Sequence, residues 1–276
     1  MTKWRYVAVD VDGTLLDDHD HFDAARLNRD VQLLAAQNVM FIVASGNSYD
    51  ALQTIFLPCP AVKNFVAENG GRIIIDKKES FSQPHKRRTI VALLNYVKTI
   101  DPQPDLLSLS GAQQTFIAAR YQNVPVPYYP HHAYFLQLAE INEPLYNLNI
   151  NWHRHHPPLK WIHDLVHQIN QQFPTVHATY SGAWGIDILP GGVDKAVSLT
   201  QLIHTTGGKM QELIAFGDTS NDQEMITAAG CGYAMKNATA DLLQLADRVT
   251  QYDNNHDGLL REIERLFQLG RLQEIT

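Results

Sequence analysis

The sequence predicts an α/β protein in which a parallel sheet with flanking helices is interrupted by an inserted α+β segment. Near both ends of the 276-residue chain, short apolar runs alternate with segments whose apolar residues recur at helical spacing. Between residues 83 and 189 the pattern is less regular, with short strands and two helical segments. We therefore expect a core domain from residues 1–82 and 190–276, and an inserted domain from residues 83–189.

The first part of the chain is predicted to form two strand–helix units and a hairpin. Apolar, β-branched residues predict strands at 6–9, 39–44 and 65–67, and helical spacing predicts helices at 23–38 and 48–56. Asn-Gly-Gly at 69–71 is typical of a turn, so residues 72–76 should return as a hairpin partner. The polar, basic stretch 77–88, which contains Pro84, is predicted to be a linker out of the core.

The insert and the return to the core follow in order. In the insert, helices are predicted at 89–100 and 158–173, and strands at 106–110, 115–118, 148–152, 176–180 and 185–189. Pro190-Gly191-Gly192 returns the chain to the core. There we expect strands at 213–216 and from 232, and helices at 196–206, from 224, at 240–246 and at 259–267.

Composition limits the classes of partner. The formal net charge is −7 and the pI is near 6.0, which disfavours general binding to nucleic acid or to anionic membranes. An acidic protein that binds an anionic substrate must concentrate positive charge locally, and a metal ion, a lysine or a helix N-terminus can do so. The sequence gives no sign of an obligate protein partner.

A cytoplasmic location is the default expectation. The first residues show no signal-peptide pattern, and no apolar run is long enough to cross a bilayer. Cys59 and Cys231 are too few for a disulfide framework and have small or apolar neighbours, as expected of buried thiols in a reducing compartment.

The strand predicted at 6–9 ends in two acids. Asp10 and Asp12 would share one face if the strand continued, and Gly13 allows the backbone to turn away sharply. Two converging carboxylates repel each other unless a cation lies between them, and Mg²⁺ prefers such oxygen ligands. Taken alone, an acidic turn without a metal is the competing interpretation.

Polar groups also follow two neighbouring strands. Ser45-Gly46-Asn47 alone fits an ordinary turn or helix cap, but its place one strand–helix unit after the acids favours a phosphate site. Asp218, Asn221 and Asp222 follow the strand at 213–216. Lys195 begins a predicted helix, which is the unfavourable end for a cation, so a solvated surface lysine is an equal alternative on local grounds.

Histidines gather in the insert. His153, His155 and His156 suggest a zinc site, but they lack the i, i+4 helical spacing and a thiolate partner. We therefore favour a surface or substrate-facing role for them over metal ligation.

The polar groups together resemble, in type and order, the four motifs of the haloacid dehalogenase (HAD) superfamily, whose first motif is Asp-x-Asp-Gly-Thr. Residues 68–70 (Glu-Asn-Gly) and 235–238 (Met-Lys-Asn-Ala) are similar to signatures of its Cof-type branch, which has a HAD-like Rossmannoid core and a large α+β cap (C2B type) between the second and third motifs. Residues 44–47 and 253–258 resemble bacterial sugar-phosphate phosphatases most. Asn47 and Lys236 stand where many Cof-type members have arginine and glycine, respectively.

The resemblance implies a Mg²⁺-dependent phosphatase that hydrolyses small phosphomonoesters, such as sugar phosphates, through an aspartyl-phosphate. Asp10 is then the nucleophile and Asp12 the general acid and base. The implied metal ligands are Asp10, Asp218 and the backbone carbonyl of Asp12, with Asp222 as a supporting carboxylate. The implied phosphate-binding residues are Val11, Ser45, Gly46, Lys195 and Asn221.

Two other functions stay open at this point. A sugar phosphomutase would use the same aspartyl-phosphate but return the phosphoryl group to a second hydroxyl. A non-catalytic phosphate-binding module is weaker, because it has no need of Asp12 beside Asp10. In the cap, Tyr180, Ser181 and Trp184 are candidate substrate contacts, with core packing as their competing role, and a sugar or polyol phosphate is the expected substrate.

Overall fold

The computed structural model describes residues 4–126, 129–182 and 184–269. Its larger sheet is organised around β1 (Tyr6–Val9), which lies between β12 (Leu213–Gly217) and β2 (Met40–Ala44) and is parallel to both. The full strand order is β14-β13-β12-β1-β2-β3-β4-β5. The remaining strands are β3 (Phe65–Ala67), β4 (Arg72–Ile75), β5 (Lys78–Ser82), β13 (Cys231–Ala234) and β14 (Arg248–Val249).

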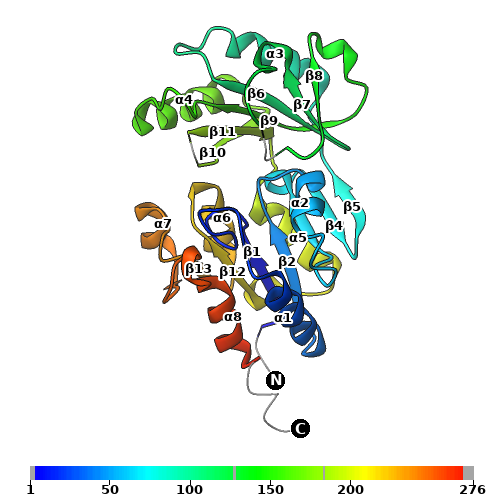
Figure 1. The fold of residues 1–276 in the computed structure, drawn as a ribbon, viewed down its shortest axis with the longest axis vertical. Coiled ribbons are helices and arrows are strands. Elements are labelled where there is room, and N and C mark those ends of the chain that lie inside the picture. The colour runs from blue at the N-terminus through cyan, green and yellow to red at the C-terminus, as the bar shows by residue number, and fades with distance from the viewer. Residues whose placement is uncertain (1–3, 127–128, 183, 270–276) are drawn as a thin grey trace.

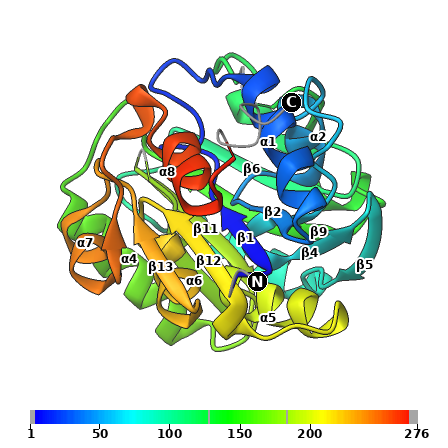
Figure 2. The same cartoon turned by 90° about the horizontal axis from the view of Figure 1, so that it is seen from below.

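Helices cover both faces of this sheet because its central strands are apolar on both sides (Figure 2). Val7 and Val9 pack with α1 (Ala24–Ala36), α2 (Tyr49–Ile55) and α8 (Gly258–Phe267). The alternate residues Tyr6 and Ala8 pack on the other face with α5 (Lys195–Thr205), α6 (Gln223–Ala228) and α7 (Ala240–Leu245). We call this sheet and its helices the core.

The second sheet lies above the core in Figure 1 and has the order β10-β11-β9-β6-β7-β8. Its pairs are antiparallel except β7–β8. Two helices, α3 (Arg87–Val97) and α4 (Leu159–Gln172), pack on its apolar face. We call this sheet and its helices the cap. The cap strands are β6 (Leu106–Gly111), β7 (Thr115–Ala118), β8 (His132–Phe135), β9 (Leu145–Asn151), β10 (Val176–Tyr180) and β11 (Gly185–Pro190).

The central residues of three cap strands alternate between apolar and polar side chains. Leu148 and Ile150 of β9 lie in the apolar cluster under the helices, whereas Asn147 and Asn149 line a cavity on the opposite face. The same alternation occurs in β6 and in β11. Because successive side chains of a strand point to opposite faces, the cap presents its polar face to the core.

The segment expected to be a linker is more ordered than predicted. Residues 78–82 form β5, an edge strand antiparallel to β4, and α3 already begins at Arg87. The expectation was wrong because β5 is an exposed edge strand, whose polar residues carry no apolar alternation. Strand β8 was not predicted, and β9 begins at Leu145 rather than at residue 148. The exact boundaries of the two domains stay a prediction.

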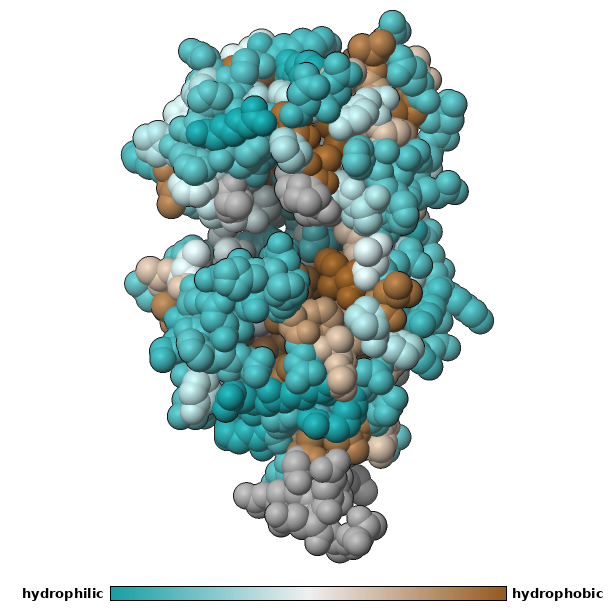
Figure 3. Space-filling model, in the orientation of Figure 1, coloured by the Kyte–Doolittle hydropathy of each residue, from teal (hydrophilic) through white to brown (hydrophobic). Residues whose placement is uncertain are grey.

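Core and cap touch around the cavity between them, and the space-filling view shows an indentation at this level (Figure 3). Ser110 of β6 donates to Glu68 (3.3 Å), and the Arg72 guanidinium donates to the carbonyl of Ala112 (3.1 Å). Burial raises the pKa of Glu68 to about 7. Within the described ranges, no helix is long and apolar enough to cross a membrane.

Candidate active site

The chain leaves β1 through a turn that brings Asp10 beside Asp218. The Asp10 amide donates to the carbonyl of Phe216 (3.0 Å), which prolongs the β1–β12 pairing up to the acid. Gly13 has a φ of +72°, and a Cβ there would lie 2.4 Å from Asp218 Oδ2. Only glycine therefore combines this backbone conformation with this close approach.

Lys195 lies between two carboxylates. Its Nζ donates to Asp10 Oδ1 and to Asp222 Oδ1, both at 2.7 Å, and the side chain is fully buried. Burial lowers the pKa of Lys195, but attraction by Asp10 and Asp222 outweighs it and holds that pKa above its ordinary value. The surface-lysine alternative is thus wrong, because the two ion pairs compensate the unfavourable position at the start of α5.

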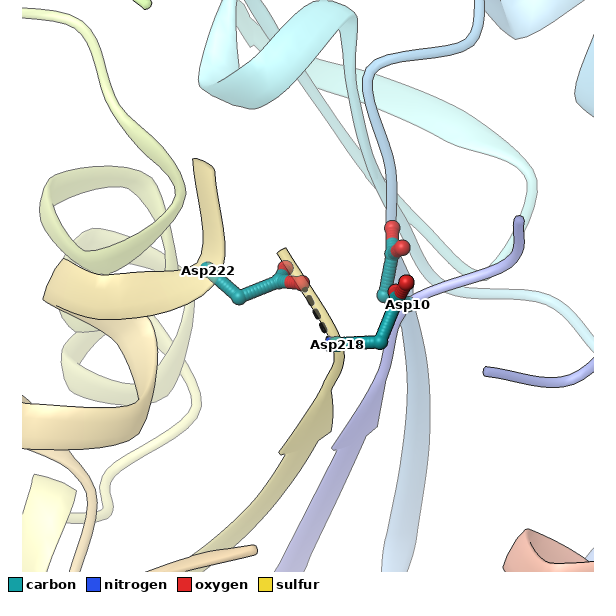
Figure 4. A group of neighbouring side chains, drawn as sticks. All are labelled: Asp10, Asp218 and Asp222. Atoms are coloured by element: carbon teal, nitrogen blue, oxygen red, sulfur yellow. Dashed lines mark hydrogen bonds between the residues drawn. The ribbon is translucent and has the colours of Figure 1, made fainter. Parts of the chain in front are cut away.

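The Asp218 carboxylate pairs with a hydroxyl group, whereas the Asp10 carboxylate pairs with the Lys195 ammonium. Thr14 Oγ1 donates to Asp218 Oδ1 (3.1 Å), while Asp222 Oδ2 accepts from the backbone amide of Asp218 (3.0 Å). Figure 4 shows the carboxylates of Asp10, Asp218 and Asp222 grouped at the ends of β1 and β12 and the start of α6. Burial, followed by repulsion from Asp222, raises the pKa of Asp218 to about 7. Burial and the same neighbour also raise the pKa of Asp10 well above its usual range.

These three acids are the one group in the described ranges with metal-like spacing, since one oxygen from each lies within 4.8 Å of the others. The donors are all carboxylate oxygens, and one ammonium faces three acids. A hard divalent cation such as Mg²⁺ fits this donor set and the excess of negative charge.

The Asp12 side chain is not part of this group. It is exposed to the cavity and accepts from Asn47 Nδ2 (2.6 Å), and the cavity walls desolvate its carboxylate and raise its pKa. Asn47 thus presents a neutral amide to Asp12 at a position where many Cof-type members have arginine. The predicted metal contact of Asp12 is its backbone carbonyl, which stays a prediction.

The predicted phosphate-binding residues divide into two groups. Gly46 and Asn221 line the cavity. Ser45 is fully buried and accepts from the Asn47 amide (3.1 Å), while the Val11 side chain packs in the apolar core. A contact of Val11 with phosphate would therefore use its main chain.

The cavity has a volume of about 480 Å³ and is lined by both core and cap. On its cap side the sequence analysis named Ser181 but missed the residues of the cap strands, which include Asp187 of β11. Asp187 is buried, which raises its pKa, and amide donors from Asn147, Asn149 and Asn69 lower that pKa in part. The alternation Asn-Leu-Asn-Ile-Asn at 147–151 was the available signal, since it predicts one polar strand face.

Of the three cap residues expected at the substrate, Ser181 lines the cavity. Trp184 instead stacks on His156 (ring centroids 4.0 Å apart), and Tyr180 packs against His163 (5.3 Å). Both rings pack with the apolar cluster of the cap, so packing is their role.

The insert histidines make separate contacts. His155 Nδ1 bonds to the Asp105 carboxylate, and His153 Nδ1 lies 2.9 Å from Asn151 Oδ1. His156 is the histidine that stacks on Trp184.

The segments 235–238 and 253–258, which resemble family signatures, form hydrogen bonds with the loop after β1. Asn237 Nδ2 donates to the carbonyl of Gly13 (2.8 Å), and Asn254 Nδ2 donates to that of Leu16 (3.0 Å). Lys236 is exposed and lies outside the cavity lining. These segments therefore support the acidic turn rather than contact the cavity.

Residues 7–263 match the haloacid dehalogenase-like hydrolase family. The chain belongs to this family. It is 28% identical over 273 residues to 5-amino-6-(5-phospho-D-ribitylamino)uracil phosphatase YbjI of Escherichia coli (strain K12), with 96% of each chain covered. It is 25% identical over 282 residues to the phosphatase of the same name YitU of Bacillus subtilis (strain 168), with 97% of this chain and 99% of that protein covered.

Solved structures agree on the fold. SMU.1108c from Streptococcus mutans UA159 has a TM-score of 0.86 and 25% identity, with 96% of this chain and 99% of that chain covered. A haloacid dehalogenase-like hydrolase from B. subtilis has a TM-score of 0.81 and 18% identity over 95% of this chain and 99% of that chain. The predicted family, hydrolase class and core-plus-cap fold are thus confirmed, and the relatives support a phosphatase that acts on small phosphate esters.

Proposed function

We propose that this protein hydrolyses small phosphomonoesters, most readily sugar or polyol phosphates, by Mg²⁺-assisted transfer of the phosphoryl group to Asp10. The observation that carries the proposal is that Asp10 and Asp218 lie close together in the lining of the cavity between core and cap, with the Lys195 ammonium buried behind Asp10. Such a site can neutralise and align an anionic ester, which is most of what phosphoryl transfer requires of a protein.

Asp10, Asp218 and the Asp12 carbonyl would hold the metal, with Asp222 orienting them. When bound, a divalent ion supplies positive charge that offsets the repulsion between the acids and the phosphate dianion. The charge balance of the site supports this assignment, because the one ammonium, Lys195, pairs with Asp10 and Asp222, while the partner that the described residues offer the Asp218 carboxylate is the Thr14 hydroxyl.

The chain's own groups carry the covalent steps. An Asp10 carboxylate oxygen attacks phosphorus, and the bond from phosphorus to the ester oxygen breaks. Asp12, which faces the cavity, donates its proton to the leaving alkoxide. Asp12 then removes a proton from a water molecule, which attacks the phosphorus of the aspartyl-phosphate and releases phosphate with Asp10 restored.

Lys195 orients the Asp10 carboxylate by donating to its Oδ1. We assign the attack on phosphorus to Oδ2, the oxygen that does not bind the ammonium. The Gly46 amide and Asn221, which line the cavity, would hold phosphoryl oxygens, with Ser45, Val11 and Lys195 behind them.

The cap encloses the substrate. A volume of about 480 Å³ suits a ligand of the size of a sugar phosphate, and the cap strands close one side of the cavity. Exclusion of water then favours transfer to Asp10 over side reactions. The relatives named as ribitylaminouracil phosphatases, whose named substrate contains a phosphorylated polyol chain, support this class.

The proposal keeps the cytoplasmic location and the small-molecule partner predicted from the sequence. Cys59 is a buried free thiol, and burial raises its pKa to about 11, in line with a reducing compartment.

A phosphate-release screen over sugar, polyol, nucleotide and peptide phosphates tests the proposal. We expect release from sugar or polyol phosphates in the presence of Mg²⁺ and loss of that release in EDTA. Equal activity in EDTA would contradict the metal assignment. Little phosphate release together with dependence on a sugar bisphosphate activator would instead identify a phosphomutase.

A further inference from the structure

The cap side of the cavity is polar, and none of its described residues is a cation. Among the described residues that line the cavity, none is lysine, arginine or histidine, and the fully buried Lys195 lies behind Asp10. The cap contributes hydroxyl and amide groups from the polar faces of its strands. These residues are Ser108, Ser110, Thr115, Asn147 and Asn149.

Asp187 is the one carboxylate that the cap strands add to this lining. Its Oδ1 accepts from Asn147 Nδ2 and from Asn149 Nδ2, each at 2.8 Å, and its Oδ2 accepts from Asn69 Nδ2 at 2.7 Å. A carboxylate offers about four acceptor positions, two on each oxygen. One position on Oδ2 therefore remains for a donor from the cavity.

Asp187 Oδ2 also lies beside the proposed phosphate site. A Cβ at Gly46 would be 3.2 Å from this oxygen and 3.1 Å from Asn69 Nδ2. Asn69 in turn accepts from Asn221 Nδ2 (3.1 Å), so an amide chain joins the phosphate side of the cavity to Asp187. A donor that reaches Oδ2 must belong to the part of the leaving group that is close to the ester oxygen.

The charges around the cavity exclude an anionic leaving group. Asp12 and Asp20 face the space in which the leaving group must lie. A carboxylate or a second phosphate there would meet these acids without a compensating cation.

We propose that Asp187 is the residue that selects the leaving group, its Oδ2 accepting a hydrogen bond from a hydroxyl next to the phosphoester of an uncharged, hydroxylated chain. This inference rests on the proposed phosphatase function and adds a specificity-determining residue to it. The three amide N–H donors already compensate the charge of Asp187, so the site favours a neutral hydroxyl over an ammonium group.

The test compares esters that share a carbon chain and differ in its substituents. Ribitol 5-phosphate and n-pentyl phosphate have the same chain with and without hydroxyls, and 5-aminopentyl phosphate and a carboxylate-bearing ester add one charge of each sign. The wild type should hydrolyse ribitol 5-phosphate with the highest kcat/KM. Asp187→Asn should lower the ratio of kcat/KM for ribitol 5-phosphate over n-pentyl phosphate by about thirtyfold, since the amide oxygen stays with the Asn147 and Asn149 donors and the acceptor at the Oδ2 position is lost.

Asp164→Asn is the matched control, because Asp164 is an exposed acid of α4 in the same cap and pairs with Lys160. It should leave the ratio unchanged. Asn149→Ala removes one amide donor to Asp187 at a half-buried position and should also lower the ratio. This variant provides the test if Asp187→Asn does not fold.

Three outcomes would overturn the inference. They are an equal loss of activity on both esters in Asp187→Asn and in Asn149→Ala, a wild-type preference for the carboxylate-bearing ester, and a preference for the ammonium ester. Absence of phosphate release from every ester in the wild type would instead contradict the proposed function itself.

Discussion

The core and the cap present polar groups to the same cavity, but each builds them differently. In the core, charged side chains stand at the ends of β1 and β12, where backbone amides and Lys195 compensate Asp10 and Asp222. In the cap, mostly uncharged side chains stand in the middle of β6, β9 and β11 on the face opposite the apolar cluster. Charged groups at strand ends are thus separated from mostly uncharged groups along the cap strands, and the bond from Asn69 to Asp187 links the two sets.

The largest effect should come from the core. Asp10→Asn should lower kcat by about 10⁴-fold or more, because an amide cannot attack phosphorus. The fold should persist, since the amide keeps the size of the side chain. Rates of phosphate release and a circular dichroism spectrum check both points, and a variant with substantial Mg²⁺-dependent turnover would show that another group is the nucleophile.

A substitution of Asp218 in the core should change the pH dependence of stability as well as the activity. Without metal, the folded protein holds a proton on Asp218 up to about pH 7, whereas an unfolded aspartate loses it near pH 4. Stability linked to this proton is therefore present at low pH and lost as the pH rises from about 4 to about 7. Asp218→Asn should remove this loss, worth on the order of 4 kcal/mol, and should also abolish activity.

Thermal melting from pH 4 to pH 8, with and without Mg²⁺, measures this effect. In the wild type at pH 8, Mg²⁺ at a hundred times its Kd should add about 2.7 kcal/mol of stability, and in Asp218→Asn it should add far less. Equal stabilisation of the two proteins by Mg²⁺ would place the metal elsewhere.

The smallest effect should come from a residue that belongs to neither polar face. Lys236 is exposed and outside the cavity lining, so Lys236→Gly should change kcat/KM by less than about twofold. Steady-state kinetics on the best ester of the screen measure it. A tenfold change would mean that the charge of Lys236 acts on the approaching substrate.

Much of the core site could be predicted from the sequence. Asp10, Gly13 and Asp218 follow apolar runs, and parallel neighbours bring such strand ends together, so their meeting was predictable without coordinates. The linker prediction at 77–88 failed because an edge strand such as β5 needs no apolar alternation. Tyr180 and Trp184 were weighed for the cavity on residue type alone, which does not say where a ring points.

The sequence by itself determined which residues carry charge and on which strand ends they stand, because apolar periodicity and chain order fix a parallel sheet. Tertiary structure alone decided how those charges are compensated. Lys195, at an unfavourable helix end on local grounds, is held by Asp10 and Asp222, and each acid is more than 25 residues from it in the chain. Asp187 reaches Asn69 across the core–cap boundary for the same reason: electrostatic and hydrogen-bond partners are set by proximity in space, which local sequence patterns do not encode.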